Sequence, residues 1–143
     1  MQRRIQTFYV GVKAFVVRDD RLLVLRESLE PHWWELPGGR IDVGEEQLAP
    51  EDVLRRELAE ELGAAFRCAI DAPLFTWVRP PRTSTAPPTF LLGLRCREAV
   101  GEIALSDEHQ ELRWVGCDEW QVLHLAPGYD LALARFWRHV GRA

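Results

Sequence analysis

Cysteine pairs are missing from this sequence, and their absence excludes two classes of protein. Cys68, Cys96 and Cys117 are odd in number, far apart, and in no CxxC pair. This pattern argues against a disulfide framework and against a zinc site. We therefore expect reduced thiols on small, buried or half-buried side chains in a cytoplasmic protein.

Long apolar runs and an excess of positive charge are also missing. No stretch approaches the length of about 20 apolar residues that a membrane span requires. The segment 5–18 is interrupted by Gln6, Gly11 and Lys13, so it does not resemble a secretion signal. The net charge is -4 and the pI is about 5.6, which gives no electrostatic footprint for a nucleic-acid polymer. We expect no membrane and no polymer as partner, and favour a small nucleotide.

The pattern of the chain predicts a mixed α+β fold. Its 143 residues suit a single domain, residues 1–143, with its own core. Aromatic and β-branched residues, turn residues and apolar periodicity indicate the elements. Strands are predicted at 7–17, 21–25, 66–71, 74–78, 89–97 and 111–115, helices at 50–62 and 129–140, a turn at Pro37-Gly38-Gly39, and a proline-rich loop at 79–88. The first two strands form a hairpin around Asp19 and Asp20.

One helix carries a concentrated acidic face. With about 100° per residue, Glu57, Glu60 and Glu61 share an arc of roughly 100°, beside an apolar stripe that includes Leu58 and Leu62. Like charges at i and i+4 destabilise a helix by about 0.2 to 0.5 kcal/mol per pair, whereas a bound cation reverses that sign. Mg²⁺ takes oxygen ligands of this kind. An amphipathic helix with a solvated acidic face is the simpler alternative.

The residues around this helix resemble the Nudix box of the MutT-like diphosphohydrolases, written G-x5-E-x7-R-E-U-x-E-E-x-G-U with U a bulky aliphatic. The box positions are occupied by Gly39, Glu45, Arg56, Glu57, Leu58, Glu60, Glu61 and Gly63, behind Leu36-Pro37-Gly38. Two departures stand out. Ten residues separate Glu45 from Arg56 in place of seven, and Ala64 replaces the last aliphatic. A longer loop costs little, but it leaves the direction of Glu45 open.

The resemblance implies the Nudix fold, an α/β/α sandwich with a mixed β-sheet and the box helix packed on it. It implies a hydrolase that cleaves a diphosphate bond in a nucleoside diphosphate linked to another moiety, with Mg²⁺, or Mn²⁺ in its place, as cofactor. The implied metal ligands are the carbonyl of Gly39 and the side chains of Glu57, Glu60 and Glu61. Nucleoside triphosphates, ADP-ribose-like compounds and dinucleotides all remain open as substrates, for a monomer or a homodimer.

The catalytic candidates lie in the box and in one later segment. Arg56 precedes Glu60 by four residues and can orient its carboxylate. The run Leu105 to Val115 resembles the E-H-x-E-x-R-W-V pattern of some Nudix enzymes, which makes Glu108, with Glu111 behind it, a candidate for a further ligand or the general base. Glu60 is the other candidate base, and the sequence leaves this choice open.

Substrate-binding candidates are aromatic or basic. Trp33 and Trp34 are adjacent, so an extended chain points them to opposite faces; one belongs to the core, and Trp34 is the candidate for stacking on a nucleobase. Arg40, Arg79 and Arg82 are candidates for pairing with phosphate oxygens.

Several side chains and one whole function are interpreted more simply. The four histidines, His32, His109, His124 and His139, show no ligand spacing, so no site role is predicted for them. None of the cysteines has the context that an isopentenyl-diphosphate isomerase of the same fold would need. The alternative function is a noncatalytic Nudix-like sensor domain that binds a nucleotide without cleaving it.

Overall fold

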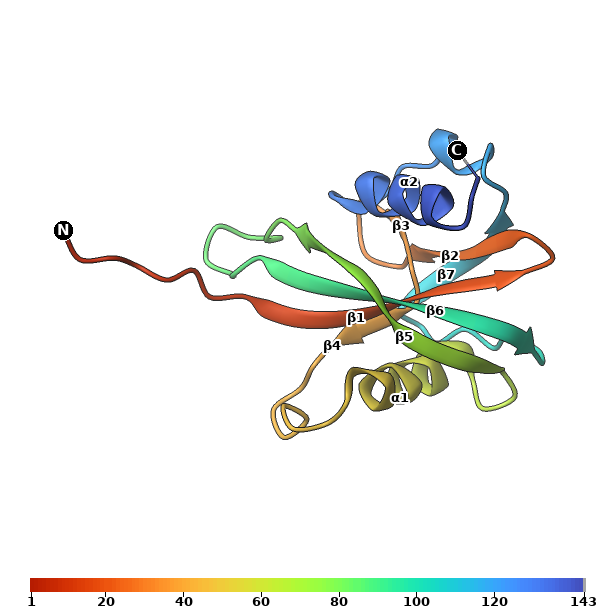
Figure 1. The fold of residues 1–143 in the computed structure, drawn as a ribbon, viewed down its shortest axis with the longest axis horizontal. Coiled ribbons are helices and arrows are strands. Elements are labelled where there is room, and N and C mark those ends of the chain that lie inside the picture. Colours follow the sequence, from red (N-terminus) through yellow and green to blue (C-terminus); the bar gives the residue numbers. More distant parts are fainter. Residues whose placement is uncertain (143) are drawn as a thin grey trace.

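A mixed β-sheet lies between two helices, one on each side (Figure 1). The computed structural model describes residues 1–142. The strands are β1 (Tyr9–Arg18), β2 (Arg21–Glu27), β3 (Trp34–Glu35), β4 (Gly38–Arg40), β5 (Arg67–Arg79), β6 (Thr89–Val100) and β7 (His109–Val115). The helices are α1 (Pro50–Leu62), α2 (Tyr129–His139) and a 3-10 turn, η1 (Trp120–Val122). The predicted α/β/α sandwich is confirmed.

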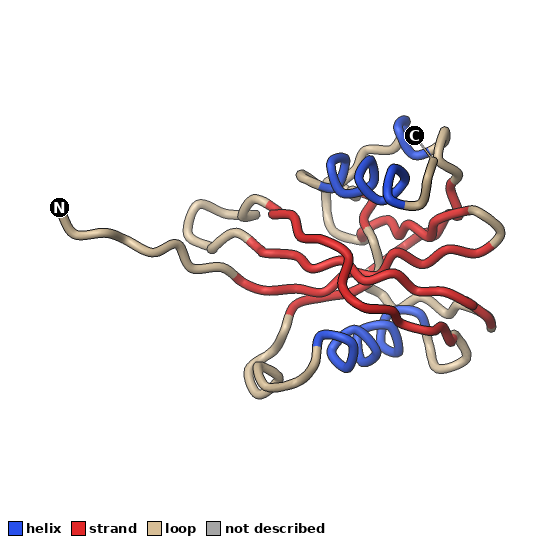
Figure 2. The backbone as a smooth tube through the Cα atoms, viewed as in Figure 1, coloured by secondary structure: helices blue, strands red, loops and turns tan. Residues whose placement is uncertain are grey.

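Strand β1 organises the sheet because it has different partners along its length. The main order is β3-β2-β1-β6-β5, with β4 paired to β1 and β7 to β2. The β1–β6 pairing is parallel, and β1 pairs antiparallel with β4 along Gly11–Lys13 and with β2 near Val17. Strands β2 and β4 therefore pair with different parts of β1. Strand β3, which pairs with β2, lies on a separate branch of the sheet from β4 (Figure 2).

The predicted hairpin and the first helix form where local chemistry favours them. Asp19 and Asp20 join β1 to β2 with φ of 52° and 60°, the left-handed geometry of a two-residue hairpin loop. Helix α1 has Pro50 in its first turn and Glu51 and Asp52 at its positive end, both favourable there. It ends at Gly63, whose N–H donates to the carbonyl of Ala59 and whose φ is 86°.

Two local predictions were wrong. The strands predicted at 66–71 and 74–78 are one continuous edge strand, β5, with irregular register on both sides of Pro73. An edge strand accommodates proline because one side of it makes no ladder hydrogen bonds. The expected turn at Gly38 and Gly39 is instead the short strand β4, which pairs with β1.

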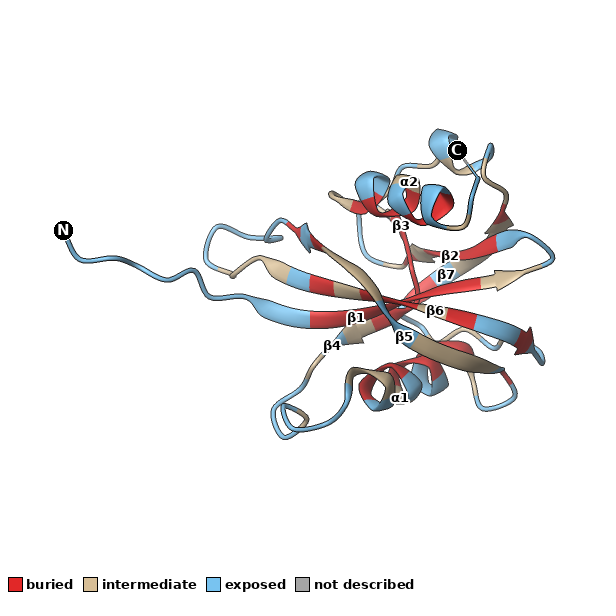
Figure 3. Cartoon of the chain, in the orientation of Figure 1, coloured by how far each residue is buried: buried red, intermediate tan, exposed pale blue. Residues whose placement is uncertain are grey.

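The core has two layers, one on each face of the sheet (Figure 3). Beneath α2 it is aromatic, and Phe15 stacks on Phe136 with a centroid distance of 4.6 Å. Beneath α1 it is aliphatic, with Val53, Leu54 and Leu62 fully buried. Within residues 1–142, no helix is both long enough and apolar enough to cross a membrane.

Candidate active site

The glycines of β4 bring the backbone against the acidic face of α1. The N–H of Gly38 donates to Oε1 of Glu61 at 2.8 Å. A Cβ at Gly39 would lie 2.5 Å from the carboxylate of Glu57, and one at Gly38 would lie 2.1 Å from the carbonyl oxygen of Val12. Glycine is therefore required at position 38, where a side chain would meet main chain, whereas a side chain at position 39 would displace the Glu57 carboxylate.

The three box glutamates differ in burial, as the helical arc predicts. Glu57 and Glu61 are buried, with 9% and 2% of their surface exposed, whereas the side chain of Glu60 is 56% exposed. Burial raises the pKa of Glu61 to about 7 and also raises the pKa of Glu57. The face of α1 thus holds two carboxylates whose charged forms are disfavoured without added positive charge.

Arg56 connects the box loop to the helix. Its guanidinium donates to both carboxylate oxygens of Glu45, to Glu57 at 2.9 Å and to Glu60 at 3.3 Å. Glu45 also accepts from the backbone N–H of Asp42. The longer loop therefore still directs Glu45 at Arg56, and the predicted contact of Arg56 with Glu60 is one of several.

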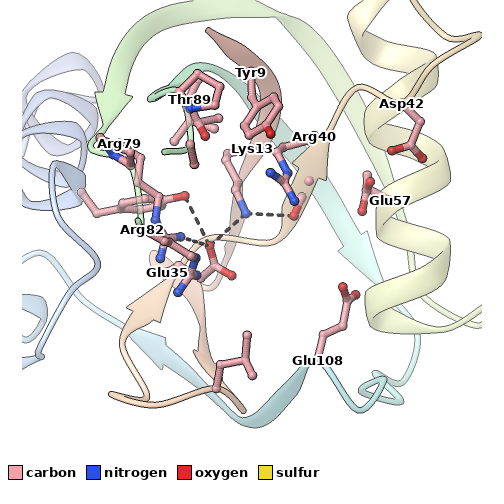
Figure 4. Close-up of a pocket in the computed structure, with 18 of the residues that line it drawn as sticks. Tyr9, Lys13, Glu35, Arg40, Asp42, Glu57, Arg79, Arg82, Thr89 and Glu108 are labelled. Carbon is pink, nitrogen blue, oxygen red and sulfur yellow. Dashed lines mark hydrogen bonds and ion pairs between the residues drawn. The ribbon is translucent and has the colours of Figure 1, made fainter. Parts of the chain in front are cut away.

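A pocket of about 570 Å³ opens beside these groups, between α1, the glycines of β4 and the proline-rich loop (Figure 4). It brings together most of the residues singled out from the sequence. Of the predicted site residues, Gly39, Arg40, Arg56, Glu57, Glu60, Arg79 and Glu108 line it. Glu61 lies directly behind this wall, on the Gly38 amide. Acids gather on the α1 side, and Arg79 and Arg82 lie on the opposite side (Figure 4).

Trp34 does not belong to the pocket, so the stacking role predicted for it has no support. It is 6% exposed and packs in the aromatic core, with the guanidinium of Arg113 over its ring at 4.9 Å. Trp33 is half-buried, and Arg79 and Arg82 lie over its ring at 5.6 and 5.9 Å. Because both tryptophans pack against protein groups, neither ring is available to stack on a substrate.

Sequence reasoning missed a buried charged network at the base of the pocket. Glu35 accepts from Lys13 at 3.0 Å, from His109 at 2.9 Å and from the hydroxyl of Tyr129 at 3.3 Å. Burial opposes ionisation of Glu35, but the charges and hydrogen bonds of Lys13 and His109 together outweigh burial and lower the pKa of Glu35 to about 2. Burial likewise opposes the charge on Lys13, whose pKa the anionic neighbours raise above its ordinary value.

His109 was interpreted as having no site role, but it connects this network to the box helix. Its Nδ1 lies 3.7 Å from Oε2 of Glu61 and has no hydrogen-bond partner within residues 1–142. Burial lowers the pKa of His109, but the hydrogen bond and charge of Glu35 raise it overall. A signal was available: Lys13, Glu35 and His109 each interrupt or flank an apolar strand.

Glu27 extends the network to the proline-rich loop. Its two oxygens accept from Arg79 at 2.8 Å and from Arg82 at 2.6 Å. Arg79 is buried and also reaches Glu35 at 3.4 Å, whereas the side chain of Arg82 is 43% exposed. The end of β5 and the proline-rich loop are therefore each held to β2 by one arginine.

The residues on the α1 side suit a divalent cation. Glu57 packs directly against Gly39, in space that any side chain at position 39 would fill. Burial raises the pKa of both Glu57 and Glu61, so a nearby cation would favour their ionised forms. No three acidic, histidine or cysteine side chains within residues 1–142 converge to hold a metal by themselves. Mg²⁺ commonly needs only one or two carboxylates, with water and substrate phosphate as its other ligands.

Comparisons with known proteins agree with this geometry. Residues 7–136 match the family model of the NUDIX domain. The chain is 33% identical over 111 residues to a MutT-like protein of Streptomyces ambofaciens, across 77% of this chain and 65% of that protein. It is 36% identical over 73 residues to the RNA pyrophosphohydrolase of Ruthia magnifica subsp. Calyptogena magnifica, across 50% of this chain and 39% of that protein.

A solved structure shows the same fold. The MutT protein from Methanosarcina mazei Go1 aligns with a TM-score of 0.80 at 20% identity, across 98% of this chain and 100% of that chain. The matches to the two curated relatives span less than two thirds of their length. The fold and the glycine–glutamate site define a protein of the MutT type. The chain belongs to the Nudix hydrolase family.

Proposed function

We propose that this protein is a divalent-cation-dependent diphosphohydrolase, which cleaves a diphosphate bond in a nucleoside diphosphate linked to another moiety. The observation that carries the proposal is the contact of Glu57 and Glu61 with the glycines of β4, at the wall of a pocket with arginines on its other side. Acids on one side suit a cation, and arginines on the other suit phosphate oxygens.

The proposed ligands are the carbonyl of Gly39 and the carboxylates of Glu57, Glu60 and Glu61, for Mg²⁺ or for Mn²⁺ in its place. When bound, such an ion neutralises the diphosphate and lowers the pKa of the attacking water. Arg56 holds Glu57 and Glu60 through its hydrogen bonds, so its proposed role is to position them. Arg40 and Arg79, both in the pocket wall, are proposed to hold phosphate oxygens.

Two carboxylates are proposed as alternative acceptors of the proton from water. Glu60 and Glu108 both line the pocket and are both exposed at its surface. The general base contributes roughly 10²- to 10⁴-fold to the rate. Replacing the residue that acts as the base by glutamine is therefore expected to lower kcat by that factor. Replacing the other of the two glutamates should lower kcat by less. Comparing kcat for Glu60→Gln and Glu108→Gln at saturating Mg²⁺, together with the Mn²⁺ affinity of each variant, distinguishes the two residues, because losing a metal ligand also weakens the affinity whereas losing only the base does not.

The pocket favours a substrate with a sizeable second moiety. Its volume of about 570 Å³ lies within the usual range for small-molecule sites, and Leu29, Pro80, Pro81 and Pro87 add apolar surface to the wall. One relative is named as an RNA pyrophosphohydrolase. The 5′-triphosphate end of an RNA is therefore a further candidate substrate, beside nucleoside triphosphates, ADP-ribose and dinucleotides.

A hydrolysis panel tests the proposal. The wild type and Glu61→Gln are assayed with these candidates, with and without Mg²⁺, by release of phosphate or pyrophosphate and by chromatography of the nucleotide product. We expect metal-dependent turnover by the wild type and a loss of more than about 100-fold in the variant, since even indirect metal contacts are worth 10- to 100-fold. Asp52→Asn, on the exposed side of the same helix, is the matched control.

Two results would contradict the proposal. Equal turnover by Glu61→Gln would remove Glu61 from the metal site. Nucleotide binding without Mg²⁺, with no hydrolysis of any panel member, would favour the noncatalytic sensor, because a sensor needs only recognition.

A further inference from the structure

Lys13 is the only lysine in a chain that has 17 arginines. It lies on β1 between Val12 and Ala14 and is 6% exposed. A buried lysine is uncommon because its ammonium must lose water. The position of this one, at the base of the pocket and directly beside β4, calls for a functional explanation.

All three donors of the Lys13 ammonium are used within the protein. Nζ lies 3.0 Å from Oε1 of Glu35, 3.2 Å from the carbonyl oxygen of Leu36 and 2.8 Å from the carbonyl oxygen of Gly38. A lysine has three N–H donors, so none remains for a substrate. Lys13 therefore acts on the backbone that leads into β4, and Figure 4 shows its ammonium between Glu35 and that strand.

This backbone carries the two contacts that fix the box glutamates. The N–H of Gly38 donates to Glu61, and the missing side chain of Gly39 leaves room for Glu57. Lys13 binds the same peptide segment through the carbonyls of Leu36 and Gly38. The ammonium of Lys13 and the carboxylates of Glu57 and Glu61 thus contact the same short stretch of main chain.

Lysine suits this position better than arginine. Its compact ammonium directs donors to three acceptors around one nitrogen, whereas the guanidinium is planar and larger. An arginine would have to place a flat group between two backbone carbonyls and a carboxylate that converge on a single nitrogen.

We propose that Lys13 is a positioning residue that holds the Leu36–Gly38 backbone so that Glu57 and Glu61 keep their metal-binding geometry. This inference rests on the proposed metal-dependent function. The competing explanation is that Lys13 only balances the charge of Glu35. The two explanations differ in which of its bonds matter: the bonds to the two carbonyls, or the bond to the carboxylate.

A pair of variants separates these explanations. Glu35→Gln removes the carboxylate charge but leaves both bonds of Lys13 to main-chain carbonyls. Lys13→Met/Glu35→Gln removes those bonds as well, without leaving a buried, unpaired carboxylate that would threaten folding. Circular dichroism and thermal unfolding establish that both variants are folded.

Two measurements are made on each protein. Amide hydrogen exchange of Gly38 in the metal-free protein reports on the backbone alone. Mn²⁺ affinity, by electron paramagnetic resonance of the free ion, reports on the carboxylates without any substrate. Neither measurement depends on turnover.

We expect Glu35→Gln to keep both the Gly38 protection and the Mn²⁺ affinity close to wild type. In the double variant, protection of Gly38 should fall by at least about tenfold, the factor for one charge-assisted hydrogen bond. The Kd for Mn²⁺ should rise roughly 10- to 100-fold, as for other residues that orient metal ligands.

Three results would overturn the inference. If the double variant matches Glu35→Gln in both measurements, Lys13 only balances charge. If Gly38 loses protection but Mn²⁺ affinity is unchanged, the segment does not position the carboxylates. If the wild type binds no Mn²⁺, the proposed function fails as well, and the exchange data still show whether Lys13 fixes the backbone.

Discussion

The two helices pack on opposite faces of the same sheet, but they bury different chemistry. Helix α2 buries Tyr129, Phe136 and Trp137 and no carboxylate. Helix α1 buries Glu57 and Glu61 among its leucines. The α2 side is thus stabilised mainly by apolar packing, whereas the α1 side carries charges that oppose folding until a cation neutralises them. The contrast indicates that the acidic chemistry is concentrated on the α1 side, and Tyr129 links α2 to the site through its hydrogen bond to Glu35.

The largest effect expected is on stability, on the α2 side. Phe136 is fully buried, stacked on Phe15 and edge-on to Trp137. Phe136→Ala should reduce the free energy of unfolding by about 3 to 5 kcal/mol, the usual cost of a large cavity, as measured by urea denaturation.

The molecules that remain folded should keep the Mn²⁺ affinity of the wild type, because α2 lies on the other face from Glu57 and Glu61. Leu131→Ala is the control on the same helix, since Leu131 is 67% exposed and should change stability by no more than about 0.5 kcal/mol. A parallel loss of metal affinity in folded Phe136→Ala would break the comparison.

The next effect concerns the pH dependence of the metal-free protein. The pKa of Glu61 is raised from 4.5 to about 7, so its contribution to stability is full below about pH 4.5 and is lost as the pH rises through about 7. The pKa of Glu35 is lowered to about 2, so its contribution is full above about pH 4.5 and is lost as the pH falls through about 2. Stability in EDTA should therefore be greatest near pH 4.5 to 5.

The loss between pH 4.5 and 8 should be roughly 3 kcal/mol at most, at about 1.4 kcal/mol per pKa unit. Urea denaturation at several pH values measures it. Glu61→Gln should flatten the upper part of the curve, because glutamine does not ionise. A wild-type protein that becomes more stable between pH 4.5 and 8 would show that the burial of Glu61 carries no cost.

A smaller effect is expected from adding metal. Mg²⁺ at 100 times its Kd should stabilise the folded protein by about 2.7 kcal/mol near pH 8, which lies above the raised pKa of Glu61. Near pH 4.5 the stabilisation should be much less, since protons compete for the same oxygens. Thermal unfolding with Mg²⁺ or EDTA measures the difference, and Glu61→Gln should show little response at either pH.

Much of the α1 side was predictable because its signals are local. Pro50 and Gly63 mark the ends of the helix, and the spacing of Glu57, Glu60 and Glu61 fixes which of them turn inward. The Asp19-Asp20 turn is equally local. The continuity of β5 through Pro73 was not predictable, because it depends on β5 being an edge strand.

The charged network was harder to predict because its partners are distant in sequence. Glu35 contacts Lys13, His109 and Tyr129, which come from three other elements. Each looks like an isolated polar residue until the strands align, and no periodicity links them. The prediction for Trp34 was wrong for a different reason. Adjacent tryptophans in an extended chain indicate that one of them faces the core, but not which one, and Trp34 packs in the core of the α2 side.

The smallest effect expected concerns Glu45, in the longer loop before α1. Glu45→Gln should lower kcat by no more than about fivefold, the range expected of a single ion pair near the surface that is only partly buried, because Arg56 keeps its bonds to Glu57, Glu60 and the carbonyl of Arg40. Steady-state kinetics at saturating Mg²⁺ measures this change, with Glu46→Gln, an exposed neighbour, as control. A loss above about 100-fold would instead assign Glu45 a direct part in metal binding, and the acidic site would then extend beyond the face of α1 into the loop.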